Sequence, residues 1–273
     1  MKLFVTDIDD TLSVGEIVSE KVQNACKRLR DAGWEIMIAT GRTYGTAKVH
    51  IKAAGATQPA ILYDGSRIMS LEGQEIHSSL FEPSLTRELL EFLWALPVEI
   101  QIADDEFIHC REGDRETVDF YRKAGVRIHY VSAPHTTAPV YRIGLWIRPD
   151  LLPSIERTLT IHFGDQAEVV SGGPQFLDLL PKGVSKGAAL EFYLSDLPQR
   201  PELVVAAGDH KNDLTMLQIA DVAAVPRNAV PELLSLADII MPEALEDGVE
   251  ALITHVLSPA FQTNKTDSPL LLY

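Results

Sequence analysis

The segment KLFVTDIDDTL (Lys2–Leu12) places a short apolar run directly before a group of acidic residues. Leu3–Val5 is β-branched and aromatic, which is typical of a buried strand, and Ser19–Arg30 has the apolar spacing of a helix that Gly33 ends. We therefore predict a strand, an acidic loop at its carboxyl end, and then a helix. This order is the first unit of an α/β fold.

The same alternation occurs on both sides of a long central region. The expected elements are strand Glu35–Ala39, helix Thr43–Ala54 and strand Pro59–Tyr63, then, after Pro181, helix Val184–Leu194, strand Leu203–Ala207, helix Asn212–Ile219 and strand Val222–Val225. Buried strands that alternate with helices favour a parallel sheet covered on both faces. We expect a doubly wound, Rossmann-like parallel sheet.

The central region departs from this pattern. Its expected elements are a β-hairpin of Arg67–Ser70 and Glu75–Ser78, helix Ser84–Ala95, strands Val98–Ile102 and Glu106–Cys110, helix Asp114–Ala124, strands near Ile128 and at Tyr141–Ile147, helix Leu151–Phe163, and strands Ala167–Val170 and Phe176–Leu179. We therefore predict an α/β core of residues 1–82 and 181–257, with an α+β domain of residues 83–180 inserted into it. Residues 258–273 have no periodicity and are expected to form a loose C-terminal tail.

Composition limits the classes of protein. The 273 residues are 46% hydrophobic and 23% charged, which is typical of a globular chain large enough for two domains. The net charge of -15 disfavours nucleic acid as a partner, because binding it needs clustered Lys and Arg. Cys26 and Cys110 have no spacing typical of a zinc site. Without a signal peptide or a long apolar run, we expect a cytoplasmic protein with no membrane partner, and its oligomeric state stays open.

Polar residues follow three of the predicted strands, at Asp7–Thr11, Thr40–Arg42 and Gly208–Asp213. In a parallel sheet the carboxyl ends of the strands meet at one edge, where ligands bind. Carboxylates about 4 Å apart repel by roughly 4 kcal/mol at an effective dielectric constant of about 20, so an acidic cluster there favours a divalent cation. Oxygen ligands without His or Cys favour magnesium (Mg2+), which would also attract a phosphorylated substrate to this acidic protein. For any single Asp the alternative is a loop or N-cap role.

Four motifs occur in a fixed order: DIDDTL (Asp7–Leu12), ATGR (Ala39–Arg42), PKGVSKGAAL (Pro181–Leu190) and GDHKNDLTML (Gly208–Leu217). Together they resemble the haloacid dehalogenase (HAD) superfamily of phosphatases. The insertion between the second and third motifs resembles the type C2 α/β cap of the Cof-type, subclass IIB members. The resemblance implies Mg2+-dependent hydrolysis of a small phosphomonoester, with sugar phosphates favoured, through an aspartyl-phosphate intermediate.

The resemblance also implies a role for each motif residue. Asp7 would be the nucleophile, Asp9 the general acid and base, and Lys186 a cation that holds the phosphoryl oxygens. The metal ligands would be Asp7, the backbone carbonyl of Asp9, and Asp209, with Asp213 as a further ligand or as support behind them. The phosphate-binding residues would be Thr40, Gly41 through its N–H, Arg42 and Asn212.

Two of these residues keep a simpler alternative. Lys186 could be a solvated helix side chain, and Arg42 could form a surface ion pair instead of binding phosphate. The sequence also departs from its relatives at two places. Asp10 stands where many of them have Gly, and Asp64-Gly65-Ser66 replaces the common Asn-Gly-Ala, so the role of that segment stays open.

The inserted cap would close over the strand ends and set the specificity for the leaving group. Candidate contacts are His109, Arg111, His135 and Arg142. Phosphoglycolate, nucleotides and phosphorylated cofactors remain alternatives to sugar phosphates.

Three other functions share parts of the pattern. A phosphomutase or phosphotransferase would use the same covalent step but pass the phosphoryl group to a hydroxyl instead of water. A phospho-acceptor switch uses a similar sheet edge, but a general base two residues from the nucleophile would shorten the life of its acyl phosphate. A non-catalytic binding protein would not need every catalytic position to be filled.

Overall fold

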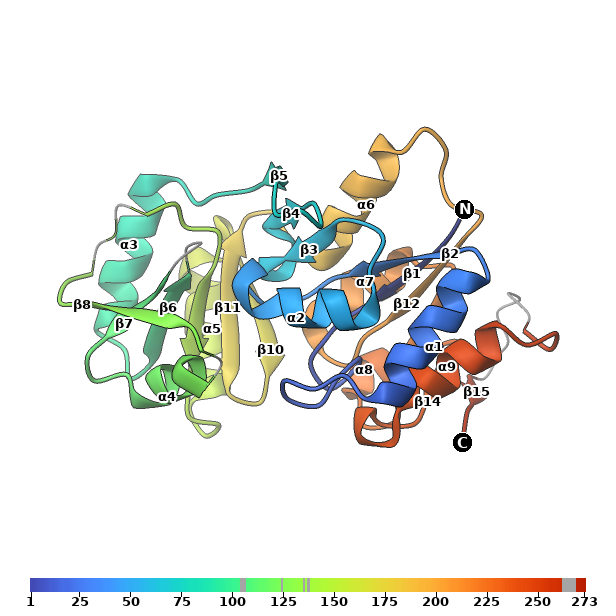
Figure 1. Cartoon of the computed structure of the whole chain (residues 1–273). Helices are drawn as coiled ribbons and strands as arrows, with labels where there is room; N and C mark the ends of the chain where they lie inside the picture. The colour runs from blue at the N-terminus through green and yellow to red at the C-terminus, as the bar shows by residue number, and fades with distance from the viewer. Residues whose placement is uncertain (104–106, 124, 135, 137, 262–268) are drawn as a thin grey trace.

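The chain folds into two bodies, which lie side by side in Figure 1. The computed structural model describes residues 1–103, 107–123, 125–134, 136, 138–261 and 269–273. Both chain ends belong to the larger body, and the middle of the sequence forms the smaller one. The predicted domain boundaries fall at the start of α3 (Pro83–Trp94) and near the end of β11 (Phe176–Pro181), and they stay a proposal. Among the described helices, none has the length and apolar character needed to cross a membrane.

The larger body is built on a six-stranded sheet in which every adjacent pair is parallel. Its strand order is β15-β14-β13-β12-β1-β2. The strands are β1 (Lys2–Thr6), β2 (Trp34–Ile38), β12 (Leu203–Ala207), β13 (Val222–Pro226), β14 (Ile239–Met241) and β15 (Leu270–Leu271). The doubly wound parallel sheet predicted from the alternation of strands and helices is confirmed.

Helices cover both faces of this sheet. Successive residues of a strand point to opposite faces, so each buried strand offers apolar side chains to helices on both sides. On β1, Phe4 belongs to one apolar cluster, and Leu3 and Val5 belong to the other. The first cluster includes residues of α1 (Glu20–Asp31), α2 (Tyr44–Ala54) and α9 (Gly248–Val256). The second includes residues of α6 (Lys186–Asp196), α7 (Leu214–Ile219) and α8 (Pro231–Leu234). Because the helices cover the faces of the sheet, the carboxyl ends of the strands remain available for a functional site.

A small antiparallel sheet lies beside β2. It consists of β3 (Ala60–Leu62), β4 (Arg67–Met69) and β5 (Glu75–Ser78), and its last two strands are the predicted hairpin. The turn η1 (Tyr63–Gly65) joins β3 to β4. The N–H of Asp64 donates to the carbonyl of Thr40 at 3.1 Å, so the turn lies against the loop after β2.

Gly65 holds this turn against the start of α6. Its φ is +106°, and a Cβ placed on it would lie 2.1 Å from the carbonyl oxygen of Ser185. We expect Gly65→Ala to lower the free energy of unfolding by about 2–4 kcal/mol, because backbone strain and a backbone clash add up. Gly33→Ala is the matched control, since its φ is +83° and no atom lies within 4 Å of the added Cβ. It should cost about 1–2 kcal/mol in denaturant unfolding, and equal losses in the two variants would contradict the close packing of Gly65.

The smaller body is a largely antiparallel six-stranded sheet with the order β10-β11-β9-β6-β7-β8. The strands not yet given are β6 (Glu99–Ala103), β7 (Phe107–Arg111), β8 (Arg127–Val131), β9 (Ile143–Trp146) and β10 (Ala167–Gly173). On one face of this sheet, residues of α3 and α5 (Leu152–Phe163) form one apolar cluster with residues of β6, β9 and β11. The alternate residues Gln101 and Asp178 line a cavity shared with the larger body, as does Tyr121 of α4 (Arg115–Lys123).

The C-terminal tail is not wholly loose. Leu270–Leu271 form β15, an edge strand held to β14 by hydrogen bonds from the N–H groups of Leu270 and Leu272. The prediction of a loose tail is wrong for these residues, because a two-residue strand is too short to show a periodicity. Four parts of the predictions lie outside the described residues: residues 262–268 of the tail, Glu106 at the start of a strand, Ala124 at the end of a helix, and His135 among the candidate cap contacts.

Candidate active site

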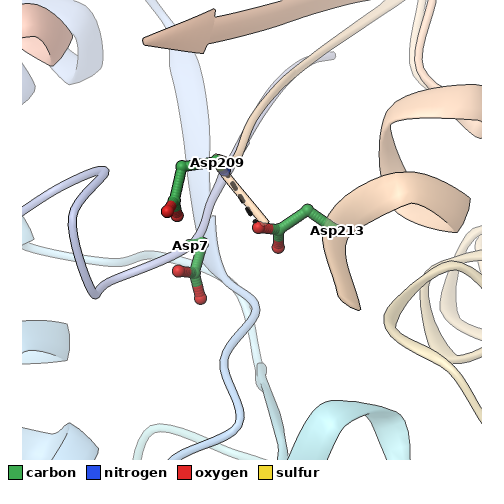
Figure 2. Close-up of side chains that lie close together, drawn as sticks. All are labelled: Asp7, Asp209 and Asp213. Carbon is green, nitrogen blue, oxygen red and sulfur yellow. Dashed lines mark hydrogen bonds between the residues drawn. The ribbon is translucent and has the colours of Figure 1, made fainter. Parts of the chain in front are cut away.

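Three aspartates gather at the carboxyl ends of β1 and β12 (Figure 2). One carboxylate oxygen from each of Asp7, Asp209 and Asp213 lies within 4.8 Å of the other two. The hydroxyl of Thr11 donates to Oδ1 of Asp209 at 3.0 Å and so orients that side chain. The first and fourth sequence motifs therefore meet at one sheet edge, because β1 and β12 are adjacent parallel strands.

Lys186 lies in the middle of this acidic group. It is the first residue of α6, which Ser185 caps by accepting a hydrogen bond from the N–H of Ala188. Its side chain is completely buried, and Nζ donates to Oδ1 of Asp7 and to Oδ1 of Asp213, each at 2.7 Å. Burial disfavours the ammonium, but the carboxylates of Asp213 and Asp7 outweigh this effect and raise the pKa of Lys186. The alternative of a solvated helix side chain is therefore wrong.

Asp213 has both carboxylate oxygens engaged. Oδ1 accepts from Lys186, and Oδ2 accepts from the N–H groups of Asp209 and His210 at 3.0 and 3.1 Å. Figure 2 shows the bond to Asp209. A Cβ at Gly208 would lie 2.5 Å from Cβ of Asp213, so only glycine allows this loop to close. Of the two roles considered from the sequence, the contacts favour Asp213 as support behind the site.

The cluster is short of positive charge. Burial raises the pKa of Asp7 well above its ordinary value, with further contributions from Asp213 and Asp209 and an opposing one from Lys186. Burial also raises the pKa of Asp209 to about 7, with Asp213 adding to the effect. Three carboxylates around one ammonium leave a net negative charge, which a divalent cation would offset.

Arg42 forms the ion pair that the sequence left as an alternative. Its guanidinium donates to both oxygens of Asp9, at 2.6 and 2.9 Å, and to Glu16 at 2.9 Å. The Arg42 side chain is 11% exposed and lines the same cavity as Asp7. In this arrangement Asp9 is held by Arg42, and a phosphate contact from Arg42 would require the guanidinium to leave these carboxylates.

The other predicted phosphate-binding residues surround Asp64. The amide nitrogen of Asn212 donates to Oδ1 of Asp64 at 2.9 Å, and a Cβ at Gly41 would lie 2.8 Å from Oδ2 of Asp64. Thr40 is completely buried, and its hydroxyl accepts from the N–H of Arg42 at 3.2 Å. Gly41, Asn212 and Asp64 line the cavity, so the segment left open in the sequence belongs to the site.

Asp10 adopts a φ of +53°, in the left-handed region. Glycine adopts this conformation most readily, and Asp is one of the residues that tolerate it. The departure from the family motif therefore leaves the turn after β1 in place.

A cavity of about 290 Å³ lies between the two bodies, above Asp7 and Asp209. The inserted domain contributes these residues to the cavity lining: Gln101, Phe120, Tyr121, Arg142, Gly172, Gly173, Pro174, Phe176 and Asp178. Of this group, the sequence predicted only Arg142. Arg142 lies 3.0 Å from Oδ1 of Asp178. Asp178 interrupts the apolar run of β11 between Leu177 and Leu179, and this interruption was the one available signal.

The cap touches the catalytic loop directly. Nδ1 of His210 lies 3.0 Å from the carbonyl oxygen of Ser171, at the end of β10. The remaining candidate cap contacts lie elsewhere: Arg111 pairs with Asp114, and His109 lies beside His129 on the adjacent strand. His135 lies outside the described residues.

A parallel sheet whose edge holds Asp7, Lys186 and Asp209 beneath an inserted domain has the arrangement of a HAD-class phosphohydrolase. The family model of haloacid dehalogenase-like hydrolases matches residues 4–253, so the chain belongs to this family. The resemblance to Cof-type HAD phosphatases is confirmed. The protein is a HAD-type phosphoric monoester hydrolase.

Similar proteins cover almost the whole chain. It is 26% identical over 257 residues to a protein of Streptococcus pyogenes serotype M6 named as a phosphatase, covering 91% of this chain and 96% of that one. It is 28% identical over 244 residues to an HMP-PP phosphatase of Yersinia enterocolitica, covering 85% and 86% of the two chains. The structure of a HAD subclass IIB sugar phosphatase superimposes with a TM-score of 0.79 at 19% identity, over 93% of this chain and 98% of that one.

Proposed function

We propose that the protein hydrolyses a small phosphomonoester in a Mg2+-dependent reaction through an aspartyl-phosphate on Asp7. The observation that carries this proposal is the buried Lys186–Asp7 pair beside Asp209 at the base of the cavity. A carboxylate held at 2.7 Å from a buried ammonium is fixed in direction and is accessible from the cavity.

In the first step, a carboxylate oxygen of Asp7 attacks phosphorus, and the bond from phosphorus to the leaving-group oxygen breaks. Lys186 offsets negative charge on the phosphoryl oxygens, since its ammonium is fixed before substrate binds. Asp9 gives a proton to the leaving oxygen and then takes one from the water that attacks phosphorus, which breaks the bond from phosphorus to Asp7 and releases inorganic phosphate. Because Arg42 holds both oxygens of Asp9, Asp9 must turn away from Arg42 to do this.

The residues present fit Mg2+. Asp7 and Asp209 each have one carboxylate oxygen in a hydrogen bond, with Lys186 and Thr11 respectively, and their other oxygens, with the backbone carbonyl of Asp9, would hold the ion. Bound there, Mg2+ would supply positive charge at the phosphoryl oxygens and at the crowded carboxylates. The raised pKa values of Asp7 and Asp209 support this fit, since the nearby positive charge does not fully offset the burial of either carboxylate.

The size of the cavity supports a small substrate. About 290 Å³ accommodates a phosphoryl group with a leaving group of sugar size. The relatives named as an HMP-PP phosphatase and a sugar phosphatase support a phosphorylated metabolite. The mutase or phosphotransferase alternative needs the same residues and differs only in the acceptor.

Phosphate release from a panel of phosphomonoesters tests the proposal. The panel should contain sugar phosphates, phosphoglycolate, nucleotides and phosphorylated cofactors, each with Mg2+ and with a chelator. We expect release that requires Mg2+ and produces inorganic phosphate. Transfer to a hydroxyl acceptor in place of phosphate release would favour the mutase, and no reaction across the panel would contradict the hydrolase.

Metal binding can be measured without turnover. Mg2+ at one hundred times its Kd should stabilise the wild-type protein by about 2.7 kcal/mol, seen as a rise in Tm, because the ion binds the folded chain. Asp209→Asn should lose most of this rise, since it removes a ligand charge. Asp150→Asn is the control, because Asp150 is an exposed cap residue paired with Arg148. An undiminished rise in Asp209→Asn would place the metal elsewhere.

A further inference from the structure

Asp64 is a buried carboxylate that lines the cavity, and one of its oxygens accepts no hydrogen bond from the described residues. The residue is 1% exposed and adopts a φ of +54°. Oδ1 accepts from Asn212, but Oδ2 accepts no hydrogen bond from any residue that the structure describes. The nearest charge is Nη1 of Arg142, at 3.7 Å from Oδ2, which is too long for a hydrogen bond. A buried polar atom without a partner is costly, so a ligand is expected to satisfy it.

A second carboxylate faces the same space from the cap. Asp178 is 6% exposed, and its Oδ1 lies 3.0 Å from Nη1 of Arg142. Arg142 therefore serves two carboxylates, one from each body. Burial raises the pKa of Asp178 to about 7, and the charge of Asp64 alone offsets Arg142, so this wall has no surplus positive charge. A substrate with a second anionic group would bring a further negative charge to a desolvated place where Arg142, the cation that the described residues supply there, is already shared.

Asp64 lies close to the reaction centre. It contacts Asn212 and Gly41, two of the proposed phosphate-binding residues. Gly172 brings the cap backbone near as well, since a Cβ there would lie 3.2 Å from Oδ2 of Asp178 and 3.7 Å from Nδ2 of Asn212. A group that reaches Asp64 must therefore be attached within a few bonds of the phosphoester oxygen.

Part of the cavity lining is apolar. The rings of Phe120 and Phe176 lie with their centroids 6.0 Å apart and line the cavity together with Pro174. These apolar residues suit the carbon skeleton of a leaving group, and the carboxylates of Asp64 and Asp178 suit a hydrogen-bond donor on that leaving group.

We propose that Asp64, together with Asp178, selects phosphomonoesters whose leaving group carries a hydrogen-bond donor near the phosphoester, an amine before a hydroxyl, and rejects those with a second anionic group. The inference rests on the proposed function and specifies its substrate class. An uncharged amide in place of Asp64 would attract an amine less strongly and would not repel an anion.

Four esters of similar size test the order of preference: the phosphate esters of ethanolamine, ethylene glycol and propanol, and phosphoglycolate. We expect kcat/KM with Mg2+ to fall in that order. Asp64→Asn should reduce the ratio of the ethanolamine ester to phosphoglycolate by about tenfold to a hundredfold, because a charge-assisted contact is lost and a repulsion is removed. The ratio cancels any general effect on phosphate binding. Asp150→Asn, the matched Asp-to-Asn change on the cap surface, should leave the ratio unaltered.

The outcomes separate the two proposals. If p-nitrophenyl phosphate is hydrolysed but phosphoglycolate matches or exceeds the ethanolamine ester, or Asp64→Asn leaves the ratio unchanged, the selectivity inference is overturned. If no ester releases phosphate, p-nitrophenyl phosphate included, the proposed function fails first and the inference falls with it. Asn has the shape of Asp and keeps an oxygen that can accept from Asn212, so Asp64→Asn should fold, and Asp178→Asn should shift the same ratio in the same direction.

Discussion

Asp7→Asn is expected to abolish phosphate release, with a fall in kcat of about 10⁴–10⁶-fold, because an amide cannot attack phosphorus. The variant keeps a side-chain oxygen that can accept from Lys186, so the geometry of the ammonium should persist. Its fold should be retained and even stabilised without metal, since burial and neighbouring carboxylates penalise the charged form of Asp7. Turnover and Tm measured on the same preparation separate loss of chemistry from loss of structure.

The covalent step can be detected directly. The wild-type protein should give a burst of the leaving alcohol, or an acid-quenched phosphopeptide that contains Asp7, when breakdown of the intermediate is slow. Asp150→Asn, tested in parallel, should keep full turnover. Turnover of Asp7→Asn within tenfold of the wild type would refute Asp7 as the nucleophile and leave direct attack by water as the mechanism.

The central part of the site followed from the sequence because parallel strands place their carboxyl ends at one edge. Asp7 and Asp209 each follow a strand with a continuous apolar run, and β1 and β12 are neighbours in the sheet. Their proximity therefore required only that the strands be recognised. Lys186 was predicted by its motif, but its complete burial depends on how α6 packs, which no local pattern reports.

The cap side of the site was less predictable. Gln101 and Asp178 lie in two different strands that pair with the same residue, Gly144 of β9. A Cβ at Gly144 would lie 2.7 Å from the Gln101 side chain and 3.3 Å from Asp178. The alignment of Gln101, Gly144 and Asp178 across three strands depends on strand register and on which face of the cap meets the core. Neither is visible in a single chain whose cap strands are short.

Lys186→Met should cost both activity and stability. Met has a similar length and no charge, so Asp7 and Asp213 would face each other without the ammonium that now contacts both at 2.7 Å. Removing one partner of a buried ion pair typically costs about 3–5 kcal/mol, which denaturant unfolding in a chelator should show. Mg2+ should restore part of this stability by replacing some of the lost positive charge. Turnover should fall by about 10³-fold or more, since a fixed cation at the phosphoryl oxygens is gone.

A double variant separates the two effects. Lys186→Met with Asp213→Asn removes one carboxylate together with the ammonium, so stability should recover by a measurable part while turnover stays low. Lys211→Met is the matched control, because Lys211 is an exposed residue in the loop that carries Asp213, and its Nζ pairs with Glu232 at 3.6 Å. It should change neither quantity appreciably. If Lys186→Met kept turnover within tenfold of the wild type while losing stability, Lys186 would be a structural counter-ion for the aspartates and not part of the chemistry.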